Sequence, residues 1–171
     1  MNVMAGELRM SEGQADRFRL VEDRLAIEDV VCALPFHLDA REFDKVSMLF
    51  TADATFDYAS LFGPEMASVQ LEAFLTNVVG ALPGFDSTQH LVSSFVIAVE
   101  GDEATARANV RATHCVGEAC WLVEGRYRHA LLRTQDGWKI RRFCLERIHE
   151  EGDRAVLAEA SARAGTRGPL G

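Results

Sequence analysis

The chain has 171 residues, of which 48% are hydrophobic and 26% are charged, and its formal net charge is −8. This length supports one well-buried core and is too short for two domains of ordinary size, so we expect a single soluble domain. The acidic balance excludes a nucleic-acid surface, because such a surface needs clustered Lys and Arg. No segment approaches the apolar length of a membrane span.

The first predicted element is a long helix from about Ser11 to Ala40. Ser11 and Gln14 have the spacing of a capping box at its start. Pro35 is expected to kink this helix or to open a turn in it, because proline cannot donate the backbone hydrogen bond that a helix needs. A break near Arg41 then separates the helix from the next element.

Three shorter elements follow this break. They are a helix over residues 44–50, a strand over 54–62 and a helix over 68–82. The pair Gly63-Pro64 ends the strand, and the pair Pro83-Gly84 closes the last helix.

The pattern then becomes alternating, which predicts four long strands. They cover residues 88–100, 103–116, 120–135 and 138–149. Short Gly-containing connections suited to hairpins separate them, so we expect a long antiparallel meander and an α+β fold. We divide the chain into a flexible N-terminus (1–13), a domain (14–150) and a short C-terminal helix with a loose tail (151–171).

The cysteine pattern indicates a reducing compartment. None of the four cysteines belongs to a CxxC pair, and Cys32 and Cys144 lie in apolar runs where a free thiol behaves as a small hydrophobe. The first ten residues, MNVMAGELRM, have no uninterrupted apolar stretch of the kind that a signal peptide carries. We therefore expect a reduced, cytoplasmic protein.

The strand over 103–116 carries a row of small side chains on one face. These residues are Ala104, Ala106, Ala108, Val110, Ala112 and His114. Successive alanines leave space rather than fill it, as a sheet curled around a ligand cavity requires. We interpret this row as a pocket wall that ends in an imidazole.

Asp39 places a carboxylate on an apolar face near the end of the first helix. At helical spacing it falls on one stripe with apolar residues (Leu25, Cys32, Phe36 and Phe43), and a buried charge there needs a partner. His90 opens an apolar strand, where a lone histidine is more often a core residue than a catalyst. An inward Asp39 would satisfy such an imidazole and leave its other nitrogen free as a base.

These features resemble a known family. The segments RLAIEDVV, LDAREFDKVSMLFTADATFDY and DGWKI, within residues 20–149, are similar to the SnoaL-like group of the NTF2-like superfamily. This group includes scytalone dehydratase, the dehydrochlorinase LinA and bile-acid 7α-dehydratases. The resemblance implies a cone-shaped α+β barrel, in which a long curved antiparallel sheet packs against N-terminal helices around a ligand cavity.

The resemblance also assigns roles to particular residues. The aspartate and histidine of the family's catalytic dyad fall on Asp39 and His90, and a second histidine and a tyrosine of scytalone dehydratase fall on His114 and Tyr58. Two positions depart from the pattern. Leu38 stands where scytalone dehydratase has another tyrosine, and Phe143 stands where LinA has an arginine.

The activity implied is that of a cofactor-independent lyase or isomerase of the dehydratase type. His90, polarised by Asp39, would remove a proton, while Tyr58 or a protonated His114 would donate one. We expect a small hydrophobic substrate with a ring, similar to a steroid, polyketide or terpenoid. The expected substrate-binding residues are Phe36, Phe43, Val110, Ala112, Tyr127 and Phe143.

Three alternatives stay open at this point. The domain could carry a small ligand without catalysis, or it could serve as the small subunit of a ring-hydroxylating dioxygenase. Asp39, His90 and His114 could also form a metal site of two histidines and one carboxylate, although no HxD or HxxxH spacing supports it. Tyr127 and His129 could face either the cavity or the outside of the sheet.

The sequence also predicts self-association. If Phe95, Trp121 or Trp138 points outward, the outer face of the sheet is too apolar to stay uncovered. We therefore expect a homo-oligomer, and the resemblance favours a trimer over a dimer.

Overall fold

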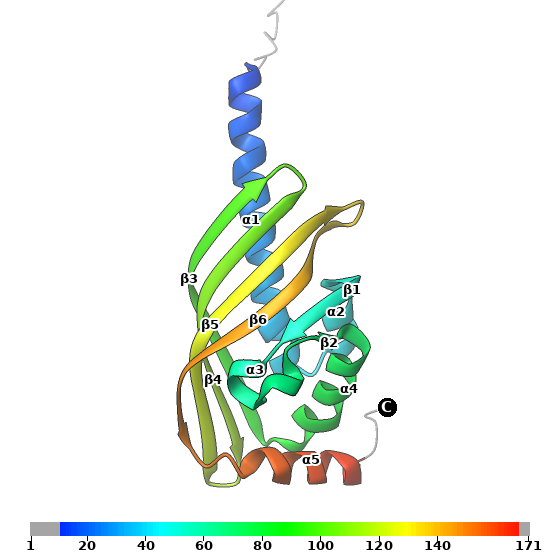
Figure 1. Ribbon diagram of the computed structural model, residues 1–171, viewed down its shortest axis with the longest axis vertical. Helices are drawn as coiled ribbons and strands as arrows, with labels where there is room; N and C mark the ends of the chain where they lie inside the picture. Colours follow the sequence, from blue (N-terminus) through cyan, green and yellow to red (C-terminus); the bar gives the residue numbers. More distant parts are fainter. Residues whose placement is uncertain (1–10, 168–171) are drawn as a thin grey trace, which may run out of the picture.

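The computed structural model describes residues 11–167 and shows an α+β fold (Figure 1). A long helix stands beside a curved sheet, and shorter helices lie against the lower part of the sheet's concave side. The elements are α1 (Glu12–Asp39), α2 (Phe43–Met48), β1 (Phe50–Asp57), α3 (Ala59–Phe62), η1 (Pro64–Met66), β2 (Val69–Gln70), α4 (Leu71–Ala81), η2 (Leu82–Gly84), β3 (Ser87–Glu100), β4 (Glu103–Val116), β5 (Ala119–Thr134), β6 (Gly137–Gly152) and α5 (Val156–Arg167). Residues 1–10 of the expected flexible N-terminus and 168–171 of the expected tail lie outside the described residues.

The sheet has six strands in the order β2-β1-β6-β5-β4-β3. Strands β3 to β6 form the predicted antiparallel meander, with bounds within a few residues of those expected. The expectation of a wholly antiparallel sheet is wrong at one place, because β1 pairs with β6 in parallel. The sheet is mixed, curved and unclosed, since β2 and β3 form its two edges.

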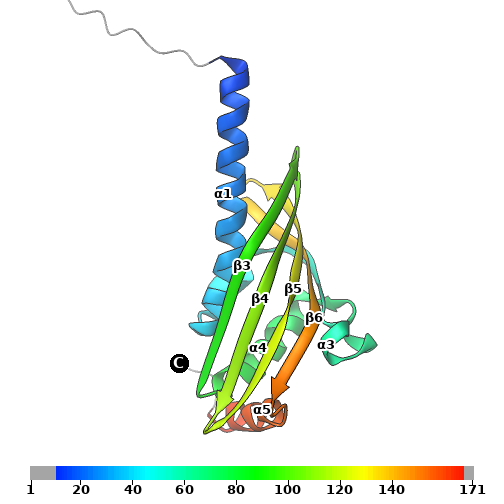
Figure 2. The ribbon, with the colours of Figure 1, turned by 90° about the vertical axis from the view of Figure 1, so that its left-hand side faces the viewer.

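Helix α1 begins at the predicted capping box, in which the Ser11 hydroxyl accepts from the Gln14 N–H and the Gln14 side chain accepts from the Ser11 N–H. It then continues through Pro35 to Asp39, so the expected turn at Pro35 does not open. Pro35 is buried, and its packing offsets the hydrogen bond that it cannot donate. The first turns of α1 extend beyond the sheet (Figures 1 and 2).

The segment after β1 corrects the predicted strand over 54–62. β1 ends at Asp57, and the Asp57 carboxylate accepts a hydrogen bond of 3.1 Å from the Ala59 N–H. A carboxylate that accepts from the backbone two residues later favours a turn over a continuing strand. Residues 59–62 therefore form α3, which turns the chain back over the concave face of the sheet.

The inward row of β4 divides into two parts. Ala104 and Ala106 belong to one buried core with Ile27 and Val31 of α1, so small side chains there leave room for a helix rather than for a ligand. Beyond them, Ala112 borders open space. The interpretation of the whole alanine row as a pocket wall is thus wrong for its first half.

Two further expectations need correction. Trp121 and Trp138 are buried rather than outward-facing, and Phe95 is half-buried. Cys115 and Cys120 form a disulfide across the β4–β5 hairpin, so the protein is not fully reduced in this structure. Of the remaining cysteines, Cys32 lies exposed on α1 rather than in the core.

Within residues 11–167, no helix has the length and apolar character needed to cross a membrane.

Candidate active site

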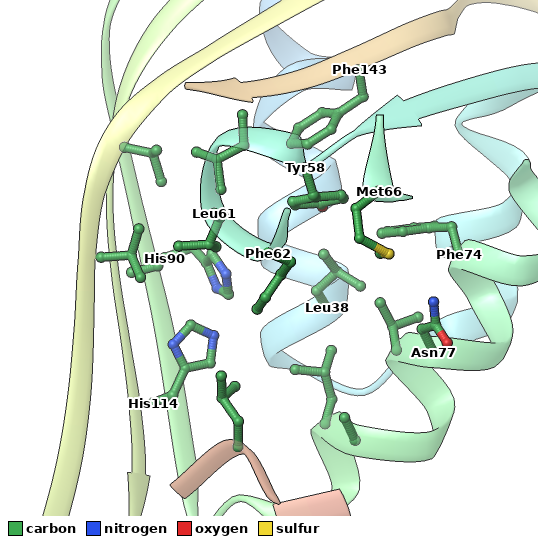
Figure 3. A pocket seen from close by; sticks show the side chains of 18 of the residues that line it. Leu38, Tyr58, Leu61, Phe62, Met66, Phe74, Asn77, His90, His114 and Phe143 are labelled. Atoms are coloured by element: carbon green, nitrogen blue, oxygen red, sulfur yellow. The ribbon is translucent and has the colours of Figure 1, made fainter. Parts of the chain in front are cut away.

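A cavity of about 220 Å³ lies between the concave face of the sheet and the short helices (Figure 3). Its polar lining residues are Tyr58, Asn77, His90, His114 and Tyr127. The rest of the lining is apolar: Leu34, Leu38, Leu61, Phe62, Met66, Val69, Phe74, Val78, Ala81, Leu82, Phe85, Val110, Ala112, Trp121, Val123, Phe143, Leu145 and Leu157. Among residues 11–167, no Asp, Glu, Lys or Arg lines this cavity. The cavity therefore suits an uncharged ligand, because a buried charge needs a partner.

Asp39 and His90 form a hydrogen-bonded pair beside this cavity. Asp39 is the last residue of α1, and His90 is the fourth residue of strand β3, which packs alongside α1. The His90 Nδ1 lies 2.7 Å from Asp39 Oδ1, and the His90 backbone N–H donates to Asp39 Oδ2 at 2.7 Å. His90 lines the cavity, whereas Asp39 lies behind it.

The charge of Asp39 fixes the tautomer of His90. Burial alone would raise the pKa of the Asp39 carboxyl, but the hydrogen bonds and charge of His90 outweigh burial and hold this pKa below its usual value. An ionised carboxylate only accepts hydrogen bonds, so Nδ1 of His90 carries a hydrogen. In a neutral imidazole the other nitrogen, Nε2, is then unprotonated and available as a base.

His114 stands next to His90 on the adjacent strand. The two rings lie edge to face, with centroids 5.2 Å apart, and Figure 3 shows both on the sheet side of the cavity. Burial, followed by the nearby charge of His90, lowers the pKa of His114 to about 3. His114 is therefore neutral at ordinary pH, which corrects its expected role as a protonated donor.

The two tyrosines of the lining are candidate hydrogen-bond donors. Tyr58 follows β1, and its ring lies 5.3 Å from that of Phe143. Burial raises the pKa of Tyr58 well above its usual range, and burial together with the charge of Asp39 raises the pKa of Tyr127. Both hydroxyls therefore stay protonated and can donate a hydrogen bond to an oxygen of a ligand.

The predicted lining residues divide into two groups. Val110, Ala112, Tyr127 and Phe143 line the cavity, as does the predicted donor Tyr58. Phe36 is 66% exposed on the outer face of α1, and Phe43 is half-buried in α2, so neither reaches the cavity. Leu25 and Phe36 do share one face of α1, but this face points outward. The inward face carries Ile27, Val31, Leu34 and Leu38 instead.

His129 is a buried residue that the cavity does not include. Its ring packs 5.3 Å from that of Phe143 and 5.8 Å from that of Tyr127, and both of its ring nitrogens are buried. Burial lowers the pKa of His129 to about 4. His129 is thus a neutral core residue on the inner side of the sheet.

The second wall of the cavity was missed by the sequence interpretation. It comes from α3, α4 and α5, with residues such as Phe62, Phe74, Asn77 and Leu157. A signal was present in α4, where the lining residues Phe74, Asn77, Val78 and Ala81 have the spacing i, i+3, i+4, i+7 of one helix face. The α3 contribution had no such signal, because that segment reads as a strand.

The arrangement of the side chains does not support the alternative of a metal site. The described residues contain no group of three His, Cys, Asp or Glu side chains placed to hold a metal ion. Asp39 instead directs its Oδ1 to the His90 Nδ1, which uses the ring nitrogen that a shared metal would need.

Helices packed on an unclosed, curved sheet around an apolar cavity define an NTF2-like α+β protein. The family model of the SnoaL-like domain matches residues 19–143. The chain therefore belongs to the SnoaL-like family.

The chain is also similar to individual proteins. An uncharacterized protein of Mycobacterium tuberculosis is 28% identical over 128 residues, which cover 70% of this chain and 82% of the relative. A protein of Novosphingobium aromaticivorans, proposed to be an aromatic ring hydroxylase, has a structure with a TM-score of 0.71 and 28% identity, covering 80% of this chain and 97% of that one.

Two further solved structures are similar to this chain. One, proposed to be a scytalone dehydratase from the same Novosphingobium species, has a TM-score of 0.70 and 26% identity, covering 80% of this chain and 90% of that one. The hexachlorocyclohexane dehydrochlorinase LinA-type3 from Novosphingobium barchaimii has a TM-score of 0.67 and 17% identity, covering 81% and 94%, and it shares the fold.

Proposed function

We propose that this protein is a cofactor-independent lyase or isomerase of the dehydratase type, which uses the Asp39–His90 pair to remove a proton from its substrate. The observation that carries the proposal is the pair itself. A carboxylate held 2.7 Å from Nδ1 leaves Nε2 of His90 as the free nitrogen of a residue that lines the cavity. The similar structure proposed to be a scytalone dehydratase, at 26% identity, supports the same reaction class.

The reaction begins with proton transfer from a C–H group to Nε2 of His90. Asp39 stabilises the imidazolium that forms, while a hydroxyl of Tyr58 or Tyr127 donates to the oxygen on which negative charge develops. In a dehydration, the bond from carbon to a neighbouring hydroxyl then breaks, and the hydroxyl leaves as water with the proton that His90 carries. In an isomerisation, His90 returns this proton to another carbon. Each positioned acid or base supplies roughly 10² to 10⁴ in rate, so the C–H must already be acidified by a carbonyl or an aromatic ring.

The cavity limits the substrate to a small, neutral compound with a ring. Its lining includes aromatic side chains on several sides (Tyr58, Phe62, Phe74, Trp121, Tyr127 and Phe143) and, in the part of the chain that the structure describes, no Asp, Glu, Lys or Arg. Its volume of about 220 Å³ lies below the roughly 300–1,000 Å³ of sites for drug-sized ligands. We therefore favour a polyketide- or terpenoid-like compound of one or two rings over a four-ring steroid.

The decisive experiment is proton exchange on a carbon acid in D₂O, using 2-tetralone as the probe, followed by mass spectrometry. The wild-type protein should introduce deuterium next to the carbonyl, and His90→Ala should not. The variants Asp39→Asn, His90→Ala and their combination then complete a four-corner cycle. We expect the double variant to be scarcely worse than His90→Ala alone, because groups that act as one unit are non-additive. Losses that multiply would refute the dyad.

A binding role without catalysis is the second candidate. The largely apolar cavity favours it. In that case 2-tetralone would bind without exchange, and His90→Ala would bind it as well as the wild type does. Co-purification with a large iron-containing chain would favour a dioxygenase-type subunit.

We also propose that the protein is a homo-oligomer, either a trimer or a dimer. The surface that supports this is not the outer sheet face but the outer side of α1 and the edge strand β3. Its exposed apolar residues are Phe18, Val21, Leu25, Phe36, Leu91 and Val96. Light scattering should give a multiple of the chain mass at micromolar concentration, and Leu25→Glu with Phe36→Glu should reduce it.

A cytoplasmic location stays a prediction. The Cys115–Cys120 bridge weighs against it, because reducing compartments keep most thiols free. Thiol labelling of the protein in intact cells would decide, since a free pair at these positions favours the cytoplasm.

A further inference from the structure

We propose that Thr88 and Arg41 are positioning residues that lock the Asp39 carboxylate, and through it the His90 ring, in a single orientation. Only the catalytic consequence of this inference rests on the proposed function. The orientation itself follows from a chain of hydrogen bonds that runs from Arg41 to Thr88, to Asp39 and to His90.

Strand β3 presents Thr88 and His90 to the same carboxylate. The two residues are separated by one position, so they share a face of the strand. The Thr88 hydroxyl lies 2.9 Å from Asp39 Oδ1, the oxygen that also faces the His90 ring. Together with the His90 N–H on Oδ2, three donors hold the carboxylate from two sides.

Arg41 sets the direction of the Thr88 hydroxyl. Its Nη1 lies 2.7 Å from the Thr88 Oγ1, and a guanidinium donates hydrogen bonds but cannot accept them. The oxygen of Thr88 must therefore accept from Arg41, and the single hydrogen of the hydroxyl is left for Asp39. A threonine without this neighbour could rotate its hydrogen away from the carboxylate.

The backbone at Arg41 gives a second, independent observation. Arg41 adopts a φ of 62°, in the left-handed region that costs a side chain other than glycine roughly 1–2 kcal/mol. Such conformations persist where the surrounding structure requires them, and they cluster at functional sites. Here the left-handed turn directs the guanidinium back to the Leu38 carbonyl at 2.8 Å and to Thr88.

The location of Asp39 explains why such a lock is needed. The carboxylate stands at the C-terminal end of α1, where the helix dipole disfavours negative charge. Its side chain is 21% exposed and borders an outer groove between α1 and β3, so water can compete for its oxygens. Donors from Thr88 and a nearby guanidinium offset both effects.

Matched variants distinguish the effect of the Thr88 hydroxyl from that of its shape. They also distinguish the effect of the Arg41 side chain from that of its left-handed backbone. Thr88→Val keeps the shape and removes the hydroxyl, whereas Thr88→Ser keeps the hydroxyl; Thr113→Val, on the outer face of β4, is the control. Arg41→Gly removes the guanidinium while relieving the left-handed backbone. Ser94→Gly is its control, because Ser94 is the other non-glycine residue with positive φ among residues 11–167.

The measurement is the solvent exchange of the His90 Nδ1–H proton, observed by NMR on ¹⁵N-histidine-labelled protein and assigned with His90→Gln. We expect Thr88→Ser and both controls to match the wild type, and Thr88→Val and Arg41→Gly to exchange about tenfold faster, as the loss of one hydrogen bond predicts. Wild-type exchange in Thr88→Val, or fast exchange in Thr88→Ser, would overturn the role of Thr88. If Arg41→Gly lowers only the melting temperature, Arg41 is merely a helix cap.

Kinetics supply the second arm. Neither Thr88 nor Arg41 lines the cavity, so in the 2-tetralone assay Thr88→Val should lower kcat about tenfold and leave KM unchanged, with rescue by Thr88→Ser. If wild-type protein does not exchange 2-tetralone, the proposed function fails, while the NMR arm still decides the inference. An unchanged kcat in Thr88→Val, with active wild type, would overturn the positioning role.

Discussion

Helix α1 carries two carboxylates that meet the sheet in different ways. Asp23 accepts two parallel hydrogen bonds from Arg133, at 2.6 and 2.8 Å, and a third from the Trp138 indole at 3.1 Å. Asp39 meets an imidazole and a hydroxyl instead. Neither carboxylate lines the cavity. Asp39, however, is hydrogen-bonded to His90, which does line it.

The difference between the two sites is the chemistry of the partner. Arg133 is always charged and also lies over the Trp138 ring, with 4.4 Å from its central carbon to the ring centroid, so the Asp23 site has a single state. Histidine can exist with or without its second proton. A carboxylate beside arginine therefore only holds the helix to the sheet, and we call the Asp23–Arg133 pair a clamp. A carboxylate beside histidine can also orient the imidazole as a base.

The largest expected effect comes from Asp39→Asn. An amide in place of the carboxylate can donate to Nδ1 and so stabilise the wrong tautomer of His90, as in serine proteases whose triad aspartate is replaced. We expect the 2-tetralone exchange rate to fall by about 10² to 10⁴. The unfolding free energy should change by less than about 1 kcal/mol, because the charge that is removed lies at the C-terminal end of α1, where the helix dipole disfavours it. Full activity in Asp39→Asn would remove the distinction between the two sites.

Asp23→Asn should show the reverse pattern. It removes a charged acceptor with three hydrogen bonds, and we expect a loss of about 2 to 3 kcal/mol in urea unfolding with an unchanged exchange rate. The hydrogen bonds of Arg133 hold the pKa of the Asp23 carboxyl below its usual value, so this stabilisation is present above the unfolded pKa near 4 and is lost as pH falls through the folded pKa. Equal stability of the variant would mean that Asp23 is not a clamp.

The buried histidines without a carboxylate partner should make the protein sensitive to acid. The pKa of His114 is lowered to about 3 and that of His129 to about 4, both by burial, so the unfolded chain binds more protons below pH 6.5 and stability falls as pH falls. At pH 5 each costs about 2 kcal/mol relative to pH 7.5. In urea unfolding at these two pH values, His129→Leu should remove half of this loss. An unchanged pH dependence would contradict the burial argument.

The smallest change in stability is expected inside the cavity. Ala112→Phe adds bulk to open space, so it should abolish 2-tetralone binding and alter the unfolding free energy by less than about 1 kcal/mol. Ala106→Phe is the matched variant in the packed half of the same strand face, and it should cost about 1 to 3 kcal/mol. Calorimetric binding and urea unfolding together would show whether the two halves of β4 differ.

Local patterns predicted most of the fold. Period-two alternation and Gly-containing turns located all four long strands, and Ser11 and Gln14 located the start of α1. The same register could have placed Cys115 opposite Cys120, since the predicted turn at residues 117–118 sets them directly across the hairpin. CxxC spacing does not reveal this bond, because the two cysteines lie five positions apart on opposite sides of the hairpin.

The candidate site was less predictable because it depends on contacts between distant segments. The residue types suggested that Asp39 needs a partner, and the family resemblance pointed to His90. The inward face of α1 could not be chosen by periodicity, since one stripe through Leu25 and Phe36 and another through Ile27 and Val31 are both apolar. The lock by Thr88 and Arg41 depends on a left-handed turn that no residue type at position 41 announces.

The unbroken course of α1 through Pro35 links the two carboxylates mechanically. At about 1.5 Å per residue, Asp23 and Asp39 are held about 24 Å apart along one helix axis. A slip of α1 by a single residue would move both carboxylates by about half the length of their hydrogen bonds and would break the contacts at each end. The contact of Asp23 with Arg133 thus helps to set the position of Asp39 along the helix axis relative to the sheet. The hydrogen-bond geometry between Asp39 and His90 therefore depends partly on a contact about 24 Å away.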